Sequence, residues 1–154
     1  MELGRASTAQ GAREELERLV SEGRLSRTES KAVDLRALVR LACSETGRLI
    51  TGSGEVLKEF AFSVLCPAGE LFPGAGEGEE ILLQGVADCC VLEPDGISII
   101  DYKTDRVSAG RAAARAEEYR PQLDAYAWAL SRVAERPVKR RIVYFLSCGE
   151  AVEL

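Results

Sequence analysis

The segment from Gly96 to Val107, GISIIDYKTDRV, constrains the fold most, because an apolar run leads directly into opposite charges. Ile97–Ile100 is typical of a buried strand, and Asp101 and Lys103 follow it. Side chains alternate between the two faces of a strand, so Asp101 and Lys103 share one face, about 7 Å apart. Charged groups at the end of a buried strand require partners elsewhere in the chain.

A predicted hairpin supplies a partner for Asp101. The turn-forming letters of LEPDGI join a strand at 81–92 to a strand at 97–104, which indicates an antiparallel pair. A loop of two or of four residues pairs positions whose numbers sum to 189, and Asp88 and Asp101 satisfy that sum. Their Cβ atoms are then expected about 5 Å apart on one face. A loop of three residues would break this register.

Two carboxylates at that distance repel each other unless a cation lies between them. Mg²⁺ prefers oxygen ligands and commonly takes one or two carboxylates together with substrate phosphate oxygens. Lys103, on the same face, could hold an attacking water or offset charge that grows on a phosphate. The pattern therefore favours a phosphodiesterase site. The structural alternative is a surface hairpin with an Asp–Lys ion pair, worth less than about 1 kcal/mol.

Periodicity predicts the remaining elements. Helical spacing of apolar residues indicates helices at 12–22, 29–43 and 117–135, with Pro121 tolerated only near the start of the last. A strand is expected at 56–65, with Phe60, Phe62 and Val64 on one face, and a final strand at 141–148. Residues 46–55 are expected to form a turn, and the prolines and glycines of 66–80 a mobile loop.

Composition excludes several kinds of chemistry. The sequence contains no histidine, which removes Ser–His and Cys–His nucleophiles and histidine-ligated metals. Its five cysteines form no C-x-x-C pair, so zinc, iron–sulfur and disulfide frameworks are not indicated. No apolar run approaches the roughly 20 residues of a membrane span, and the charged start does not resemble a secretory signal. The default expectation is a cytoplasmic protein without a membrane partner.

The net charge of −5 argues against a nucleic-acid partner, but the charge is unevenly distributed. Residues 101–141 contain ten Lys and Arg against six Asp and Glu, a balance of +4, while the remainder has ten against nineteen, or −9. A basic half could meet phosphates while the acidic part faces away. A solvated helix face explains the same distribution equally well.

Three short motifs together resemble the RecB-like nuclease module of the PD-(D/E)XK superfamily. They are GVAD, which ends at Asp88; DYKTD, which begins at Asp101; and the Q-x-x-x-Y spacing of Gln122 and Tyr126. The resemblance runs from about Glu59 to residue 145 and covers most of the chain. Any one motif alone would be weak, whereas the combination is specific.

The resemblance implies a restriction-endonuclease-like α/β core with a central mixed sheet flanked by helices. Residues 1–50 would form an N-terminal helical segment and residues 55–148 the core of a single domain, 1–154, of a larger helicase–nuclease. The implied activity is hydrolysis of DNA, of exonuclease type and on single strands, with Mg²⁺ or Mn²⁺. The implied partners are DNA, the parent's ATP-driven helicase domain and a partner nuclease or helicase subunit, in recombinational repair.

The family's functional residues map onto this sequence position by position. Asp88 and Asp101 match the metal-binding acids, and Lys103 matches the catalytic lysine. The set is completed by the backbone carbonyl of Tyr102 as a further ligand, by Gln122 and Tyr126 as supporting or DNA-contacting residues, and by Glu59 as a weak candidate acid.

One departure from the family pattern leaves an alternative open. The family usually carries a metal-ligating histidine on a helix upstream of these motifs, and this sequence has none. Either the sequence begins after that helix, which is the more natural explanation, or this member has lost the ligand. The alternative function is therefore a non-catalytic module for docking or DNA guidance. A freestanding exonuclease with a four-cysteine cluster is disfavoured by the cysteine spacing.

Overall fold

A five-stranded mixed sheet organises the chain, with its strands in the order β1-β2-β3-β4-β5. The computed structural model describes residues 1–71, 74, 76, 78–108 and 110–154. All neighbouring strands are antiparallel except β3 and β4, which run parallel. The strands are β1 (Glu55–Pro67), β2 (Glu80–Glu93), β3 (Gly96–Lys103), β4 (Val138–Phe145) and β5 (Glu150–Glu153).

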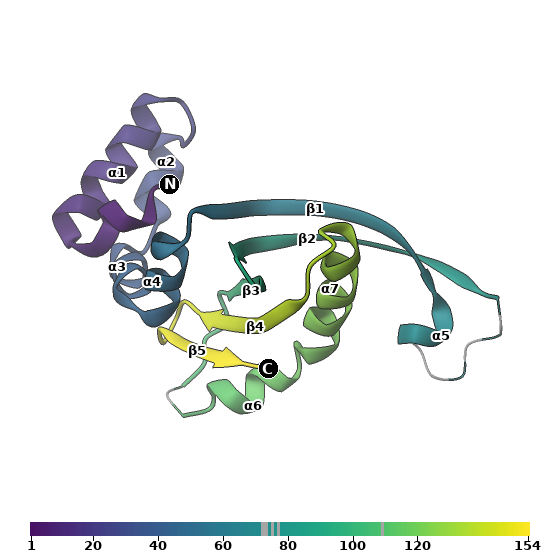
Figure 1. The fold of residues 1–154 in the computed structure, drawn as a ribbon. Coiled ribbons are helices and arrows are strands. Elements are labelled where there is room, and N and C mark those ends of the chain that lie inside the picture. Colours follow the sequence, from purple (N-terminus) through teal and green to yellow (C-terminus); the bar gives the residue numbers. More distant parts are fainter. Residues whose placement is uncertain (72–73, 75, 77, 109) are drawn as a thin grey trace.

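Helices cover the two faces of the sheet (Figure 1). The N-terminal group consists of η1 (Leu3–Ser7), α1 (Ala9–Ser21), α2 (Arg27–Ala32), α3 (Leu35–Cys43) and α4 (Glu45–Gly52). The remaining helices are α5 (Ala68–Leu71), α6 (Ala112–Glu117) and α7 (Arg120–Val133). The parallel β3–β4 crossover passes through α6 and α7, since parallel neighbours cannot be joined by a tight turn. The predicted α/β class, with a central mixed sheet, flanking helices and an N-terminal helical segment, is confirmed.

The two faces of the sheet carry separate apolar clusters. Residues of η1, α1, α3 and α4 pack against a cluster that includes Cys89, Ile100 and Tyr144. Residues of α6 and α7 pack against a second cluster that includes Ile99 and Phe145. Strand β3 thus contributes alternate side chains to both clusters, as expected for a strand buried on both sides.

The strands β1 and β2 continue beyond the rest of the sheet as a two-stranded ribbon that ends near α5 (Figure 1). Pairing between β1 and β2 runs from Glu55 to Pro67, whereas β2 pairs with β3 only over residues 89–93. The predicted face of β1 is confirmed, because Phe60, Phe62 and Val64 all join the α7-side cluster. The ribbon's opposite face leaves large apolar side chains exposed, among them Leu65 and Leu82.

Several predicted elements need correction. The helix predicted at 29–43 is interrupted, because the Asp34 carboxylate accepts hydrogen bonds from Arg36 N and Ala37 N and starts a new helix there. The turn predicted at 46–55 is wrong, since residues 45–52 form α4 with Ser44 as N-cap and Ile50 buried. The helix predicted at 117–135 begins later, at Arg120, with Pro121 in its first turn.

Tertiary contacts explain the other differences. The loop predicted at 66–80 is wrong at its start, where strand β1 reaches Pro67 and α5 follows; residues 72, 73, 75 and 77 lie outside the described part. The carboxylate of Glu70 holds α5, accepting hydrogen bonds from Trp128 Nε1 at 2.7 Å and Arg132 Nη2 at 2.6 Å. The final strand lies earlier than predicted, and α6 and β5 were not predicted at all. In the described part of the chain, every helix is too short or too polar to cross a membrane.

Candidate active site at the end of the central strand

The side chains of Asp101 and Lys103 meet at the end of β3, the middle strand of the sheet. The Nζ of Lys103 lies 2.7 Å from Oδ2 of Asp101. Both side chains lie on the face that α7 covers, since Lys103 Nζ also donates to Gln122 Oε1 of α7 at 3.2 Å. Strand alternation placed this pair on one face, as the sequence predicted.

Asp101 occupies an environment unfavourable for a charge. The residue is 4% exposed. Burial raises the pKa of its carboxyl; the hydrogen bond and charge of Lys103 oppose this, and the nearby charge of Asp88 adds to it. Although Lys103 Nζ is close, the Oδ2 atom receives no directed hydrogen bond from the described residues. That oxygen therefore retains the capacity to bind a further positive group.

A chain of hydrogen bonds continues from Lys103 along α7. Gln122, which accepts from Lys103, donates from Nε2 to the Tyr126 hydroxyl at 3.1 Å. The Tyr126 ring packs edge-on against Phe62 with 5.2 Å between centroids. A Cβ atom at Gly85 would lie 2.9 Å from Tyr126 and 2.7 Å from Phe62. The glycine of GVAD is thus required for α7 to approach the sheet, and Q-x-x-x-Y connects to the β3 acid through Lys103.

Asp88 lies where β2 and β3 separate. The observed pairs have numbers that sum to 189, as predicted from a two-residue turn, but the ladder ends at Cys89 and Ile100. One position beyond, Asp88 Oδ2 accepts a hydrogen bond from the Tyr102 amide at 2.9 Å. The Asp88 carboxylate therefore takes the place of a strand partner for Tyr102. Direct facing of the Asp88 and Asp101 carboxylates stays a prediction, as does a role for the Tyr102 carbonyl.

Glu59 marks an interruption in the neighbouring strand. Pairing between β1 and β2 skips Glu59 and Asp88, which stand between the pairs Lys58–Cys89 and Phe60–Ala87. The φ of Glu59 is +51°, a left-handed conformation that glutamate seldom adopts within a strand. The structure thus brings the weakest sequence candidate beside Asp88, at a strained position of the kind found at functional sites.

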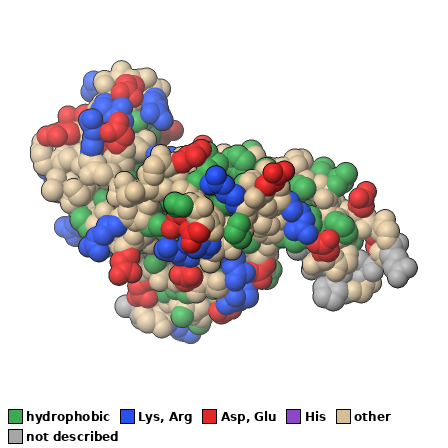
Figure 2. All heavy atoms as spheres, viewed as in Figure 1, with side chains coloured by type: hydrophobic (Ala, Val, Ile, Leu, Met, Phe, Trp, Pro, Cys, Tyr) green, Lys and Arg blue, Asp and Glu red, His purple; other side chains and the backbone are tan. Residues whose placement is uncertain are grey.

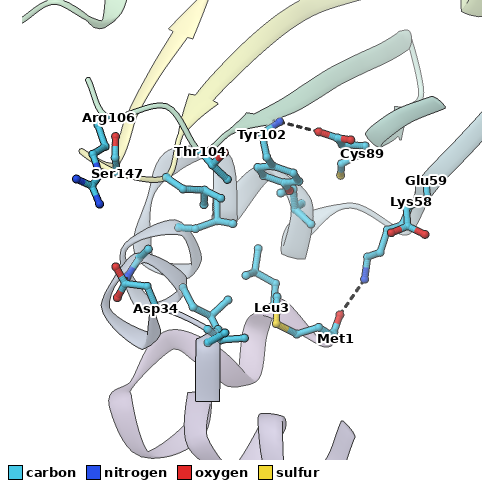
Figure 3. Close-up of a pocket in the computed structure, with 18 residues that line it drawn as sticks. Met1, Leu3, Asp34, Lys58, Glu59, Cys89, Tyr102, Thr104, Arg106 and Ser147 are labelled. Atoms are coloured by element: carbon cyan, nitrogen blue, oxygen red, sulfur yellow. Dashed lines mark hydrogen bonds between the residues drawn. The ribbon is translucent and has the colours of Figure 1, made fainter. Parts of the chain in front are cut away.

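A cleft of about 820 Å³ opens beside these two acids, between the sheet and the N-terminal helices (Figure 3). Apolar side chains of η1, α3 and α4 form much of its wall. Its polar lining includes Glu59, Asp88, Lys58 and Arg106. Asp101 and Lys103 lie instead on the α7 side, so Asp88 connects the cleft with the end of β3.

A second group of polar residues, not singled out from the sequence, surrounds the Tyr119 side chain. Its hydroxyl donates to Asp105 Oδ2 at 2.5 Å, and Arg115 donates to the same oxygen at 2.8 Å and to the hydroxyl at 3.1 Å. These bonds lower the pKa of Asp105, and the bond to Asp105 raises the pKa of Tyr119. The available signal was the spacing of Tyr119 three positions before Gln122, which places both near one helix face.

The basic character of residues 101–141 is largely neutralised. Seven of their ten cationic side chains form ion pairs, for example Arg120 with Glu117, Arg132 with Glu70 and Arg141 with Asp124. On the face seen in Figure 2, Lys and Arg alternate with Asp and Glu instead of forming one continuous basic surface. A broad electrostatic surface for DNA is therefore absent from this view, and cations within the cleft, such as Arg106, are better placed.

The donor set at the end of β3 suits a hard divalent cation that shares its coordination with a substrate. Within residues 1–71, 74, 76, 78–108 and 110–154, no three side chains of His, Cys, Asp or Glu gather to hold a metal alone. Two acids, Asp88 and Asp101, are in electrostatic contact, and one Asp101 oxygen lacks a directed hydrogen bond. Mg²⁺ typically uses such a small carboxylate set and completes its shell with water and phosphate oxygens.

A five-stranded mixed sheet between helical layers, with an acid and a lysine at the end of its middle strand, defines the class of this protein. It is an α/β domain with a restriction-endonuclease-like core. A family model described as the PD-(D/E)XK nuclease superfamily matches residues 2–152. The chain belongs to that superfamily.

Similar curated proteins are named as AddA, one of the subunits of an ATP-dependent helicase/nuclease. The protein from Desulforudis audaxviator is 43% identical over 129 residues, which cover 82% of this chain and 10% of the relative. That of Carboxydothermus hydrogenoformans is 35% identical over 148 residues, or 96% of this chain and 13% of the relative. That of Alkaliphilus oremlandii is 31% identical and covers 100% of this chain and 13% of the relative. The chain thus spans only about 10–13% of the length of these relatives.

Proposed function

We propose that this domain is a metal-dependent DNA nuclease that hydrolyses phosphodiester bonds, with exonuclease action on single strands. The observation that carries the proposal is the Lys103–Asp101 pair of 2.7 Å, with a buried Asp101 oxygen that lacks a directed hydrogen bond. The names of the relatives, helicase/nuclease subunits, support DNA as the substrate class.

Each side chain has a distinct role in this proposal. Asp88 and Asp101, with the Tyr102 carbonyl, would hold Mg²⁺ or Mn²⁺, and the bound cation would supply Lewis-acid polarisation of the phosphate. The Lys103 ammonium lies where it can hold a water or offset negative charge on the reacting phosphate. Gln122 and Tyr126 keep Lys103 and α7 in register, and Glu59 adds a carboxylate at the cleft beside Asp88.

The larger context follows from the relatives. We infer that the domain is one part of a longer helicase–nuclease of the cytoplasm, in which a helicase domain unwinds DNA and delivers a single strand. Double-strand-break repair with a partner nuclease or helicase subunit is the corresponding biological role. The cleft beside Asp88, with Lys58 and Arg106 in its wall, is the proposed path of the strand.

End-labelled single-stranded DNA tests the activity. The chain is incubated with Mg²⁺ or Mn²⁺, with and without EDTA, beside Asp88→Ala and Asp101→Ala. We expect metal-dependent cleavage that either substitution lowers about 100-fold or more, since each removes a group that acts only with the other. Equal cleavage by wild type and both variants would identify a contaminant and contradict the proposal.

A second candidate is a non-catalytic module that guides DNA or docks onto a larger assembly. It is favoured by the lack of histidine in the sequence and of a three-ligand cluster in the described residues. It predicts DNA binding that weakens steeply with salt and no cleavage with either metal. Fluorescence anisotropy beside the cleavage assay separates the two, and adding the upstream segment of a relative tests whether a missing ligand limits the rate.

A further inference from the structure

The Lys103 ammonium is held by contacts from two separate elements. From β3, Asp101 Oδ2 lies 2.7 Å from Nζ. From α7, Gln122 Oε1 accepts a hydrogen bond at 3.2 Å. The third contact is aromatic: Nζ lies 4.2 Å from the centroid of the Tyr119 ring, at the start of α7. An ammonium over an aromatic face is attracted by the ring's quadrupole, most strongly where water is largely excluded.

The Tyr119 ring is itself fixed from three directions. Its hydroxyl donates to Asp105 and accepts from Arg115, two residues that flank the crossover between β3 and α7. Arg115 also donates to Asp105, so the three side chains form a closed triangle. The ring packs against Phe145 at the end of β4, with 6.4 Å between centroids. A ring restrained in this way presents a constant face to Lys103.

We propose that Tyr119 is a positioning residue for Lys103, and that Asp105 and Arg115 fix the orientation of its ring. This inference rests on the proposed nuclease function of Lys103. The ring attracts the ammonium without accepting its proton, so the contact persists when Asp101 is engaged by another cation. Tyr119 and Gln122 together then keep the ammonium at the end of β3.

A purely structural role for Tyr119 predicts different behaviour. Its backbone carbonyl accepts from Leu123 N at 3.1 Å in the first turn of α7, a contact that any residue at this position retains. If the side chain served only to pack α6 and α7 together, its removal would change stability and leave the Lys103 environment and turnover of the folded protein unaltered.

The first measurement needs no nuclease activity. The sequence contains four lysines, so reductive methylation with ¹³C-formaldehyde gives few NMR signals, and Lys103→Arg assigns the one of interest. The ring current of Tyr119 should shift the Lys103 methyl resonance upfield in wild type and in Tyr119→Phe, which keeps the ring. In Tyr119→Leu the resonance should return to the position of an ordinary exposed lysine. A Lys103 resonance that is the same in all three proteins would overturn the proposal.

The second measurement is steady-state cleavage of single-stranded DNA with Mg²⁺. We expect Tyr119→Phe to retain kcat within about threefold, and Tyr119→Leu to lose about tenfold or more in kcat with little change in KM. Equal kcat values for the two variants would contradict a positioning role. If Tyr119→Leu does not fold, Asp105→Ala frees the ring while keeping it, and should broaden the Lys103 signal and lower kcat to an intermediate value; an unaltered signal and kcat would overturn the proposal.

The two measurements separate this inference from the proposed function. A Tyr119-dependent Lys103 resonance in a protein without cleavage would uphold the contact and reject the nuclease. Metal-dependent cleavage with a Lys103 resonance indifferent to Tyr119 would uphold the nuclease and reject the positioning role.

Discussion

The two ends of the β2–β3 hairpin each carry a lysine–aspartate pair with the same 2.7 Å separation. At the turn, Lys139 pairs with Asp95; their side chains are 30% and 69% exposed. At the far end, Lys103 pairs with Asp101; their side chains are 17% and 5% exposed. The hydrogen bond from Lys139 lowers the pKa of Asp95, whereas burial raises the pKa of Asp101.

This difference shows that separation alone does not reveal what an ion pair does. Water solvates the Asp95 carboxylate, so Lys139 adds a small favourable interaction to a charge that is already well hydrated. The Asp101 carboxylate has lost most of its hydration, and one lysine does not fully replace it. A buried, under-compensated acid is a feature of sites that bind a cation, and it is what the turn pair lacks.

Removing each lysine gives the largest expected contrast. We expect Lys103→Ala to lower kcat for DNA cleavage about 100-fold or more, because it removes a charge placed at the reacting phosphate. Lys139→Ala should leave kcat within about twofold, since its partner is a solvated turn residue. The measurement is cleavage of labelled single-stranded DNA with Mg²⁺. Comparable losses in both variants would remove the distinction between the two pairs.

Adding a methyl group at each end tests the packing around the two pairs. A Cβ at Gly85 would lie 2.7 Å from Phe62 and 2.9 Å from Tyr126, and one at Gly96 would lie 2.7 Å from the Pro137 carbonyl oxygen. We expect Gly85→Ala and Gly96→Ala each to cost about 1–3 kcal/mol in urea unfolding, as overpacking does. Only Gly85→Ala should also lower kcat, because it displaces Tyr126. Gly54→Ala, with open space at the Cβ position, is the neutral control.

The two aspartates should respond to pH in opposite directions. The pKa of folded Asp101 lies above its ordinary value of 3.8, so its stabilising contribution is complete below that pH and is lost as pH rises through the folded pKa. The pKa of folded Asp95 lies below 3.8, so its contribution is present above that pH and is lost as pH falls through the folded pKa. Between about pH 3 and pH 7, Asp101→Asn should gain stability relative to wild type, while Asp95→Asn should lose it.

Urea unfolding in EDTA across this pH range measures both effects. Parallel pH profiles for the two variants would show that burial does not distinguish the pairs. The size of each difference is expected to be smaller than the cost of overpacking, because only one titrating group changes in each variant.

The smallest effect is expected from relieving backbone strain. Glu59 and Glu135 are the described non-glycine residues with positive φ, at +51° and +52°. Asparagine tolerates this conformation better, so Glu59→Asn and Glu135→Asn should each stabilise by up to about 1 kcal/mol, or roughly 2–4 °C in Tm. We expect Glu59→Asn to lower cleavage and Glu135→Asn to leave it unchanged, since Glu135 follows α7 away from the cleft. Unchanged cleavage in Glu59→Asn would remove Glu59 from the site.

Local patterns predicted much of the fold because they depend on neighbours in sequence. Alternation along β3 placed Asp101 and Lys103 on one face, and the turn at Pro94 and Asp95 set the register of β2 against β3. The errors lie where distant contacts override propensity. The α5 helix forms within a segment rich in breakers because Trp128 and Arg132, far along the chain, hold Glu70.

What the sequence by itself determined is the set of chemical groups and their order: strand, acid and lysine on β3, a second acid one strand earlier, and Gln and Tyr one helical turn apart. What only the tertiary structure decided is their surroundings. The burial of Asp101, the diversion of Asp88 to the Tyr102 amide and the Tyr119 ring over Lys103 all depend on how α6, α7 and the N-terminal helices pack against the sheet. Desolvation and orientation are properties of packed neighbours, and a linear pattern specifies neither.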